Sequence, residues 1–231
     1  MKHNQIINHI GLKQNASWKQ LVTRLWLPAM LVIGMFTFGT ANTAHSSPQT
    51  SAANNLITTM MYDVESYLAN DSGNAVQRSQ YIARLMDTYF DLSGIARFSA
   101  GTYWRAATPD ERERYTKIMR QVMISTVTRN FDQLAGFKFT AIDTQKKGEK
   151  LVLVRGTFND ILNKRPNVSV GWRVITPVDG QAKVLDVEIE NNSMLFTQKQ
   201  ENVSIIRRNQ GNFSALIDAM TARQAKNLTP N

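Results

Sequence analysis

The period of the apolar residues changes twice along this chain, and that order restricts the fold more than any other feature. Before Gly136 apolar residues recur every three or four positions, as on the buried side of a helix. Between Gly136 and Glu190 they largely alternate with polar residues, as in a strand, and after Ser193 the helical period returns. Helices, then strands, then helices predict a single α+β domain.

Capping residues and apolar faces indicate where the helices lie. Five helices are expected, at residues 56–68, 81–90, 109–134, 194–208 and after Asn212. The third has the clearest start, because Thr108 and Glu111 form a capping box around Pro109 at the first helical position. Residues 91–106 are expected to form a short helical or turn-rich link.

The central part of the chain predicts a sheet. Four strands are expected, at residues 137–140, 151–158, 168–174 and 185–189. Because short turns join them, they should form a curved antiparallel sheet with one face covered by the helices. In the last strand, Leu185, Val187 and Ile189 alternate with acidic residues, so these three should face the core. The acidic residues are then expected in solvent: Asp186, Glu188 and Glu190.

The amino-terminal segment is typical of an export signal. Residues 1–24 carry four basic and no acidic side chains, and an apolar run of 14 residues, 25–38, follows. That run is shorter than the roughly 20 residues needed to cross a bilayer, so a cleaved signal is favoured over an uncleaved anchor. We expect a signal peptide over 1–41, with cleavage near Ala41 or Ser46.

The rest of the chain then divides into three parts: a flexible leader over 42–53, the α+β domain over 54–225 and a tail over 226–231. Removing residues 1–41 takes away four of the 27 basic residues, so the net charge falls from +9 to +5. No dense basic stripe with aromatic residues remains, and nucleic acid is therefore not expected as a partner.

The residue types needed for most catalytic chemistry are missing from the predicted domain. The chain has no cysteine, and its three histidines, His3, His9 and His45, all precede it. Thiol nucleophiles, disulfides and imidazole-based acid-base or metal sites are thereby excluded from the domain. The acidic residues of the last strand have a spacing that a hard metal ion accepts, but a solvated strand face is the simpler interpretation. We expect neither a cofactor, a metal nor an enzymatic activity.

Apolar side chains are what the domain offers instead. Several of the ten methionines lie in the predicted helices, where their flexible side chains adapt to irregular partners. A methionine-rich helical layer over a curved sheet suits a cavity for a long apolar ligand. The alternative is that these residues simply fill a solid core.

Six separated motifs recur in order along the chain: Phe90 to Arg97, Gly101 to Pro109, Trp172-Arg173, Val184 to Val187, Ser193 to Thr197 and Ser204 to Arg207. Together they resemble the MlaC family, the periplasmic phospholipid-binding components of the Mla pathway, also called toluene-tolerance proteins. The resemblance covers about residues 55–222. It implies an α+β cone related to nuclear transport factor and ketosteroid isomerase folds, and a glycerophospholipid held by its acyl chains between sheet and helices.

The resemblance also implies a place and partners. The protein would be a monomeric carrier in the periplasm that moves phospholipid between two membrane complexes and so maintains outer-membrane lipid asymmetry. The complexes would be an inner-membrane ABC transporter with its substrate-binding hexamer, and an outer-membrane lipoprotein and porin. One element departs from the family pattern: Gln198-Lys199-Gln200 stands where an Asn-Tyr-Arg-like element is usual, which affects the surface that meets a partner.

The inward faces of the predicted elements give the expected lipid site. Its residues are Tyr103, Trp104, Met119, Met123, Val127, Phe131, Leu153, Val170, Trp172, Val174, Leu185, Val187, Ile189, Leu195 and Phe196. Tyr103 and Trp104 are expected at its entrance, unless they are ordinary core aromatics. The headgroup is expected near basic residues on strand-connecting turns: Lys146, Lys147, Lys164 or Arg165. Two other functions stay open, an isomerase-like enzyme on the same fold and an adaptor with a filled core and no ligand.

Overall fold

The computed structural model describes residues 47–71, 73–177 and 180–228. The predicted signal peptide and its cleavage sites, the first residues of the leader and the end of the tail lie outside these ranges. The helices are α1 (Pro48–Ala69), α2 (Ala75–Tyr89), α3 (Leu92–Ser99), α4 (Tyr103–Ala106), α5 (Pro109–Asn130), the 3-10 turn η1 (Phe131–Leu134), α6 (Met194–Arg208) and α7 (Phe213–Leu228). The strands are β1 (Phe137–Lys146), β2 (Leu151–Asp160), β3 (Val168–Ile175), β4 (Lys183–Ile189) and β5 (Asn192–Ser193).

The sheet is an antiparallel meander in which each strand pairs with the next, in the order β1-β2-β3-β4-β5. The α+β class and the antiparallel sheet are confirmed, but the sheet has five strands where four were predicted. The fifth strand is only two residues long and pairs with Glu188 and Ile189. A segment that short carries no alternation, so its pattern gave no signal.

Side-chain caps fix the helix starts as the sequence indicates. Thr108 and Glu111 form the predicted capping box at α5, and Ser193 accepts a hydrogen bond from the Phe196 N–H at α6. Two helix starts differ from the prediction. Helix α2 begins at Ala75, after the Asn74 cap, and not at residue 81. Helix α1 begins at Pro48, inside the segment predicted as a flexible leader. Ser47 caps this helix by accepting from the Thr50 N–H at 3.3 Å, and a proline suits the first helical position.

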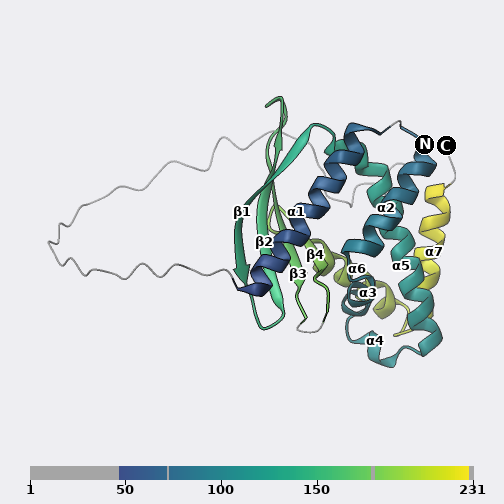
Figure 1. Cartoon of the computed structure of the whole chain (residues 1–231). Coiled ribbons are helices and arrows are strands. Elements are labelled where there is room, and N and C mark those ends of the chain that lie inside the picture. Colours follow the sequence, from purple (N-terminus) through teal and green to yellow (C-terminus); the bar gives the residue numbers. More distant parts are fainter. Residues whose placement is uncertain (1–46, 72, 178–179, 229–231) are drawn as a thin grey trace, which may run out of the picture. The chain divides into compact units, whose positions relative to one another are not determined.

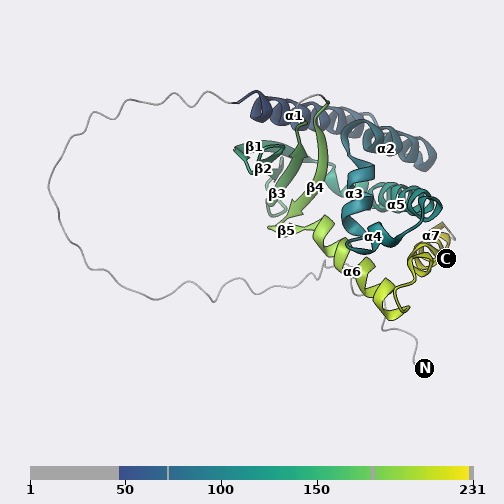
Figure 2. The same cartoon turned by 90° about the horizontal axis from the view of Figure 1, so that it is seen from below.

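The helices form two layers against the sheet. In Figure 1, α1 crosses the strands, and it contacts β1, β2 and β3. Figure 2 shows α1 along one side of the strands and α6 on the other side, where α6 contacts β4. Helix α5 lies farther from the sheet and packs on α2, α3 and α7.

The buried apolar residues form two clusters. The first, which we call the sheet cluster, lies between α1, α2 and the sheet and consists of Ala53, Ile57, Met60, Met61, Val64, Ile82, Leu85, Met86, Tyr89, Ile124, Phe131, Val152, Val154, Val170, Trp172, Val174 and Val184. The second, the helical cluster, consists of Ile95, Ala96, Ala100, Ala107, Tyr115, Ile118, Met119, Leu195, Ile206, Phe213, Leu216, Ile217 and Met220. Phe90 and Met123 pack against both, so they join the two clusters.

The side chains of β4 do not face the directions that their alternation predicts. The register between β3 and β4 shifts so that Arg173 pairs with Asp186 and Val174 with Val184, which leaves Leu185 in a bulge. Leu185 therefore does not share a face with Val187, and it packs against the helical cluster instead. Asp186 was predicted in solvent, but it is buried because α6 begins directly over that side of the strand.

Candidate ligand-binding interior

Seven of the predicted lining residues come together at the sheet cluster. Phe131, Val170, Trp172 and Val174 belong to it, and Met123, Val127 and Val187 pack against it: these seven come from α5, η1, β3 and β4. The face of β3 and the end of α5 were therefore assigned to a common interior correctly. Whether a lipid contacts these residues stays a prediction.

The other eight lie elsewhere. Met119 and Leu195 are buried in the helical cluster, and Tyr103, Trp104 and Leu185 pack against it. Leu153 is buried on the opposite face of the sheet, because it pairs with Arg173 and alternates with Val152 and Val154. Two residues predicted to line the site are exposed, Ile189 at 41% and Phe196 at 51%. Ile189 ends its strand, and Phe196 lies on the outer side of the first turn of α6.

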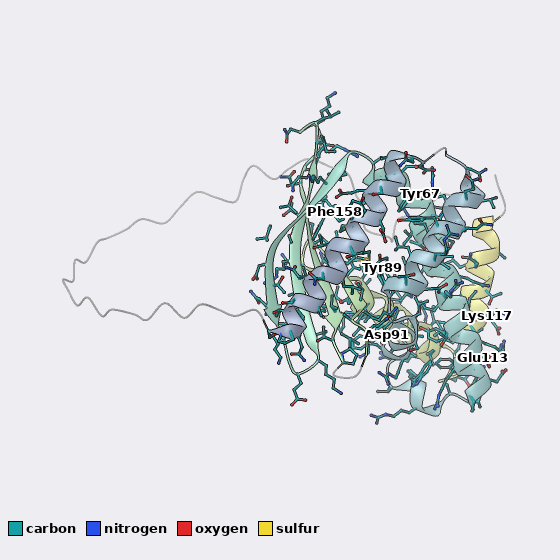
Figure 3. All side chains as sticks on the ribbon, in the orientation of Figure 1. Tyr67, Tyr89, Asp91, Glu113, Lys117 and Phe158 are labelled. Carbon is teal, nitrogen blue, oxygen red and sulfur yellow. The ribbon has the colours of Figure 1, made fainter. Side chains whose placement is uncertain are left out.

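Aromatic residues that the sequence did not single out complete the walls of the sheet cluster. On the sheet, Phe139 packs against Phe158 at 5.6 Å and edge-to-face against Trp172 at 6.4 Å, measured between ring centroids. On the helices, Tyr67 stacks on Tyr81 at 3.8 Å. Figure 3 labels one residue from each wall, Phe158 on the sheet and Tyr67 on α1. The sequence shows these aromatic residues in β1, β2 and the two helices. Which of them contact one another across separate elements cannot be predicted from their spacing.

Two buried polar atoms in this interior lack a protein partner. They are the Trp172 Nε1 and the Tyr81 hydroxyl, neither of which has a hydrogen-bond partner in the described part of the chain. More than nine in ten buried polar groups in proteins are hydrogen bonded, so both atoms call for an explanation. Burial, followed by the nearby charge of Asp63, raises the pKa of Tyr81, so its hydroxyl keeps its proton and remains a donor at neutral pH.

A carboxylate and a tyrosine also meet at the edge of the sheet cluster. Tyr89 donates a short hydrogen bond to Asp63, and both lie where α2 passes α1. Burial raises the pKa of Tyr89 to about 12, and the hydrogen bond to Asp63 adds to the shift. The isomerase alternative needs a free carboxylate base inside a cavity, whereas the Asp63 carboxylate is occupied by this tyrosine.

The sheet cluster is closed. Ile57, Val152, Val154, Val174 and Val184 have no exposed surface at all. A long apolar ligand can therefore enter only if the covering helices and the sheet move apart.

Hydrogen bonds along the edge strand hold α1 in place over this interior. The Gln49 side chain donates to the Glu149 carbonyl oxygen at 2.6 Å, and Thr144 donates to the Asn54 amide oxygen at 3.1 Å. Near the other end of the helix, the Phe139 N–H donates to the Glu65 carboxylate at 3.2 Å. The Gln49 contact is exposed and the other two are partly buried, so separation of α1 from this edge of the sheet breaks these hydrogen bonds as well as apolar contacts.

Two surface depressions lie outside the sheet cluster. The first, of about 510 Å³, lies between α3, α4 and α5 and is lined by Leu92, Ser93, Trp104, Arg112, Glu113, Thr116, Lys117 and Arg120. Figure 3 labels Glu113 and Lys117 on this part of α5. Arg112 lies over the Trp104 ring at 5.6 Å and donates to the carbonyl oxygens of Trp104 and Arg105, so it holds the end of α4. Trp104 is thus an anchored aromatic at this surface.

The second depression, of about 570 Å³, lies between β4 and the start of α6 and includes Phe98, Leu195 and Phe196. Asp186 is among its lining residues and accepts hydrogen bonds from the Ser193 hydroxyl at 2.6 Å and the Leu195 N–H at 2.9 Å. Arg173 approaches Asp186 to 3.6 Å and forms a closer ion pair with Glu188. These charges are paired with one another and serve to fix α6 on the sheet.

The basic residues predicted near a headgroup are only partly available. Arg165 is engaged by Asp160 at 2.7 Å and by the carbonyl oxygens of Gln133 and Ala135. The Arg165 hydrogen bond, with help from the Lys164 N–H, lowers the pKa of Asp160. Arg165 therefore closes the β2–β3 loop, while the side chains of Lys146, Lys147 and Lys164 are exposed: these three remain available for a headgroup.

Within the described ranges, no group of three or more histidine, cysteine or acidic side chains is placed to hold a metal ion. Each helix described is either too short or too polar to cross a bilayer.

Comparison with known proteins identifies a similar fold and the family of the chain. A structure of a phospholipid-binding protein from Ralstonia solanacearum, solved in complex with a phospholipid, superimposes with a TM-score of 0.67 at 20% sequence identity. The alignment covers 77% of this chain and 99% of that one, and at this identity it shows a shared fold. A comparison with curated protein sequences gives no match. The family model described as MlaC protein matches residues 54–222, which is most of the chain and nearly all of the described domain, and the chain therefore belongs to the MlaC family.

Proposed function

We propose that this protein binds one phospholipid by its acyl chains within the sheet cluster and carries it between membranes. The observation that carries the proposal is the sheet cluster itself, an apolar layer between α1 and the sheet whose walls come from separate elements. Such a layer can part to admit acyl chains. The phospholipid of the Ralstonia solanacearum structure gives the ligand class.

A carrier is needed because acyl chains are strongly excluded from water. Each CH2 group exposed to water costs about 0.8 kcal/mol, so two chains with about 30 such groups cost on the order of 24 kcal/mol. Unassisted transfer between two membranes is therefore negligible. A protein that covers the chains along the way removes this barrier without any chemical step, so we propose no enzymatic activity and no cofactor.

The amino-terminal segment over 1–41 and the family membership support a proposal for where the protein acts. We propose that this segment exports the protein to the periplasm as a monomer. There it would receive lipid from, or deliver it to, an inner-membrane ABC transporter complex and an outer-membrane lipoprotein and porin complex, and so maintain outer-membrane lipid asymmetry. The exposed Phe98 and Phe196 beside α6 give such complexes an apolar contact, and Lys199, which lies over the Phe98 ring at 5.0 Å, belongs to the element that departs from the family pattern.

One observation favours a second function. A closed interior is also what an adaptor without a ligand would have. Lipid extraction separates the two. The protein is purified in the form that its own host accumulates, and mass spectrometry is run on the intact protein and on its organic extract. We expect about one phospholipid per chain; absence of phospholipid together with no uptake from vesicles would establish the adaptor.

A pair of matched substitutions locates the site. Val127→Phe adds a ring at the sheet cluster, where Val127 is partly buried, and should lower lipid uptake about tenfold because the added volume competes with the acyl chains. Val76→Phe makes the same change on α2 at a side chain that is 67% exposed, and uptake should not change. Circular dichroism checks that both variants fold. Equal uptake by the two variants would place the lipid elsewhere.

A further inference from the structure

Trp172 is the residue on β3 whose polar atom the fold does not use. Its side chain is 7% exposed and faces the sheet cluster, and its strand neighbours are Val154 and Val187. Phe139 stands edge-to-face against the indole, with an angle of 82° between the rings. The surroundings are therefore apolar, and the Nε1 atom has no acceptor among the described residues.

An indole is a poor choice for this position if packing is its sole role. The Trp N–H can only donate, and an unpaired donor in an apolar interior is costly. A second unpaired hydroxyl, that of Tyr81, belongs to the helical wall of the same cluster. Two unsatisfied donors in one interior indicate that something which enters it brings acceptors.

The chemistry of a phospholipid limits which of its acceptors can reach this interior. The phosphate and the headgroup are charged and stay in water, since transfer of a charge into an apolar interior is far too costly without a partner. The acyl chains have no acceptor beyond their ester groups. The ester carbonyl oxygens lie between the acyl chains and the charged phosphate group, and they carry no charge. They are therefore the acceptors that can enter the interior together with the chains.

We propose that the Trp172 N–H donates a hydrogen bond to an ester carbonyl oxygen of the bound phospholipid, so that the site recognises the ester linkage as well as the chains. This inference rests on the proposed function. It makes Trp172 a residue that determines specificity and fixes how deep the lipid sits. The other neutral source of the same acceptor is a protonated fatty acid, and the experiment includes it.

The test compares two phospholipids that have the same headgroup and chain length, one with ester and one with ether linkages. They compete for the protein in the form that its host accumulates, after delipidation, and native mass spectrometry counts each complex. We expect the ester lipid to be preferred roughly two- to tenfold, the worth of one neutral hydrogen bond. Trp172→Phe keeps a ring but removes the donor, and should bring the ratio to about one.

Val154→Ala is the matched control, because it removes packing next to Trp172 and no hydrogen bond. It should weaken the ester and ether lipids equally and leave their ratio as in the wild type. If Trp172→Phe does not fold, the wild-type ratio still decides. Equal uptake of the two lipids by the wild type overturns the inference and leaves the proposed function intact, whereas uptake of neither overturns both.

A spectroscopic reading identifies the atom. In the ¹⁵N-labelled protein, the indole N–H signal that is missing from Trp172→Phe belongs to Trp172. It should move downfield when the ester lipid binds and stay in place when the ether lipid binds. A downfield shift with fatty acid alone, without ester preference, would assign the acceptor to a carboxyl group and overturn the ester proposal.

Discussion

Asp186 shows how a single buried carboxylate organises one side of the domain. It lies on β4, yet its partners are Ser193 and the Leu195 N–H at the start of α6 and Arg173 on β3. A carboxylate at a helix N-terminus satisfies free N–H groups and suits the helix dipole. Asp186 therefore joins the sheet to the helical cluster.

Asp186→Ala should lower the free energy of unfolding by about 2–3 kcal/mol, because the buried Leu195 N–H and the partly buried Ser193 hydroxyl lose their acceptor and Arg173 loses one of its two carboxylates. Urea unfolding followed by circular dichroism measures it. Glu201→Ala is the control. It removes a carboxylate of α6 that forms an exposed ion pair with Arg223, at 3.9 Å. That control should change stability by about 0.5 kcal/mol or less, and a similar loss in both variants would contradict the assigned role of Asp186.

Gly156 is required by a close approach between β2 and the edge strand β1. A Cβ atom there would lie 2.4 Å from the Phe139 ring and 2.5 Å from the Thr140 carbonyl oxygen. Gly156→Ala should therefore destabilise the fold by about 1–3 kcal/mol, because the β1 backbone must shift. Gly148→Ala is the control, since a Cβ atom there meets nothing within 4 Å, and stability should be unchanged or slightly higher. Thermal unfolding of both variants checks the contrast.

At the scale of elements, the two N-terminal threonines of α4 and α5 offer a direct comparison. Thr108 caps α5 by accepting from the Glu111 N–H, whereas Thr102 precedes α4 without a side-chain cap. Thr108→Ala should cost about 1 kcal/mol of folding free energy, and Thr102→Ala less than about 0.5 kcal/mol. Equal effects in chemical denaturation would show that the capping hydrogen bond does not govern the start of α5.

The loop after β2 gives a prediction that depends on pH. Because the pKa of Asp160 is lowered in the folded protein, its carboxylate stabilises the fold above the unfolded pKa of about 4, and this contribution is lost as the pH falls through the folded pKa. Asp160→Asn should therefore be less stable than the wild type at pH 7, and the difference should shrink below about pH 4.

Unfolding measured at pH 7, 4 and 3 tests this expectation. Asp110→Asn is the control, because Asp110 is 76% exposed and pairs with Arg114 at 3.6 Å within one helix. A difference between Asp160→Asn and the wild type that stays constant over this range would contradict the role of the charge.

The elements that were predicted correctly are those with a local signal. The capping box at Thr108, the cap at Ser193 and the alternation around Val170 to Val174 each act within a few residues. The errors share a different cause, because they depend on segments far apart in sequence. The burial of Asp186 is set by where α6 returns, and the bulge at Leu185 by its pairing with β3.

The burial of the candidate site residues could be predicted from the sequence only where a local signal decides it. The side of β3 that faces the interior was identified, since one strand fixes its own two faces. Helix α5 was assigned wholly to one interior, but Met119 lies in the helical cluster and Val127 at the sheet cluster, because this helix passes between both. A single apolar stripe cannot show that its two ends meet different partners.

At the scale of the whole domain, we propose that a ligand enters where α1 parts from β1. Asn54 and Thr144 touch across that boundary through their side chains. The chain has no cysteine, so any disulfide formed within the double variant Asn54→Cys with Thr144→Cys joins these two positions. In the oxidised form we expect uptake from vesicles to stop, and reduction to restore it, because the bond holds the helix on the sheet.

Intact mass shows whether the disulfide has closed, and each single variant serves as a control for the substitution itself. Undiminished uptake by the fully oxidised protein would place the opening elsewhere on the domain. It would leave the identity of the ligand unaffected.

The division of the interior into two clusters has a consequence for recognition. If cargo enters beneath α1, the spacing there changes, whereas α6 and α7 contribute buried residues only to the helical cluster, which Phe90, Met123 and helix α5 connect to the sheet cluster. A membrane complex that grips only α6 or α7 would thus find the same surface on a full and an empty protein. A complex that distinguishes lipid-bound from lipid-free protein would have to contact α1 or the edge of β1, because bound lipid would change the surface there.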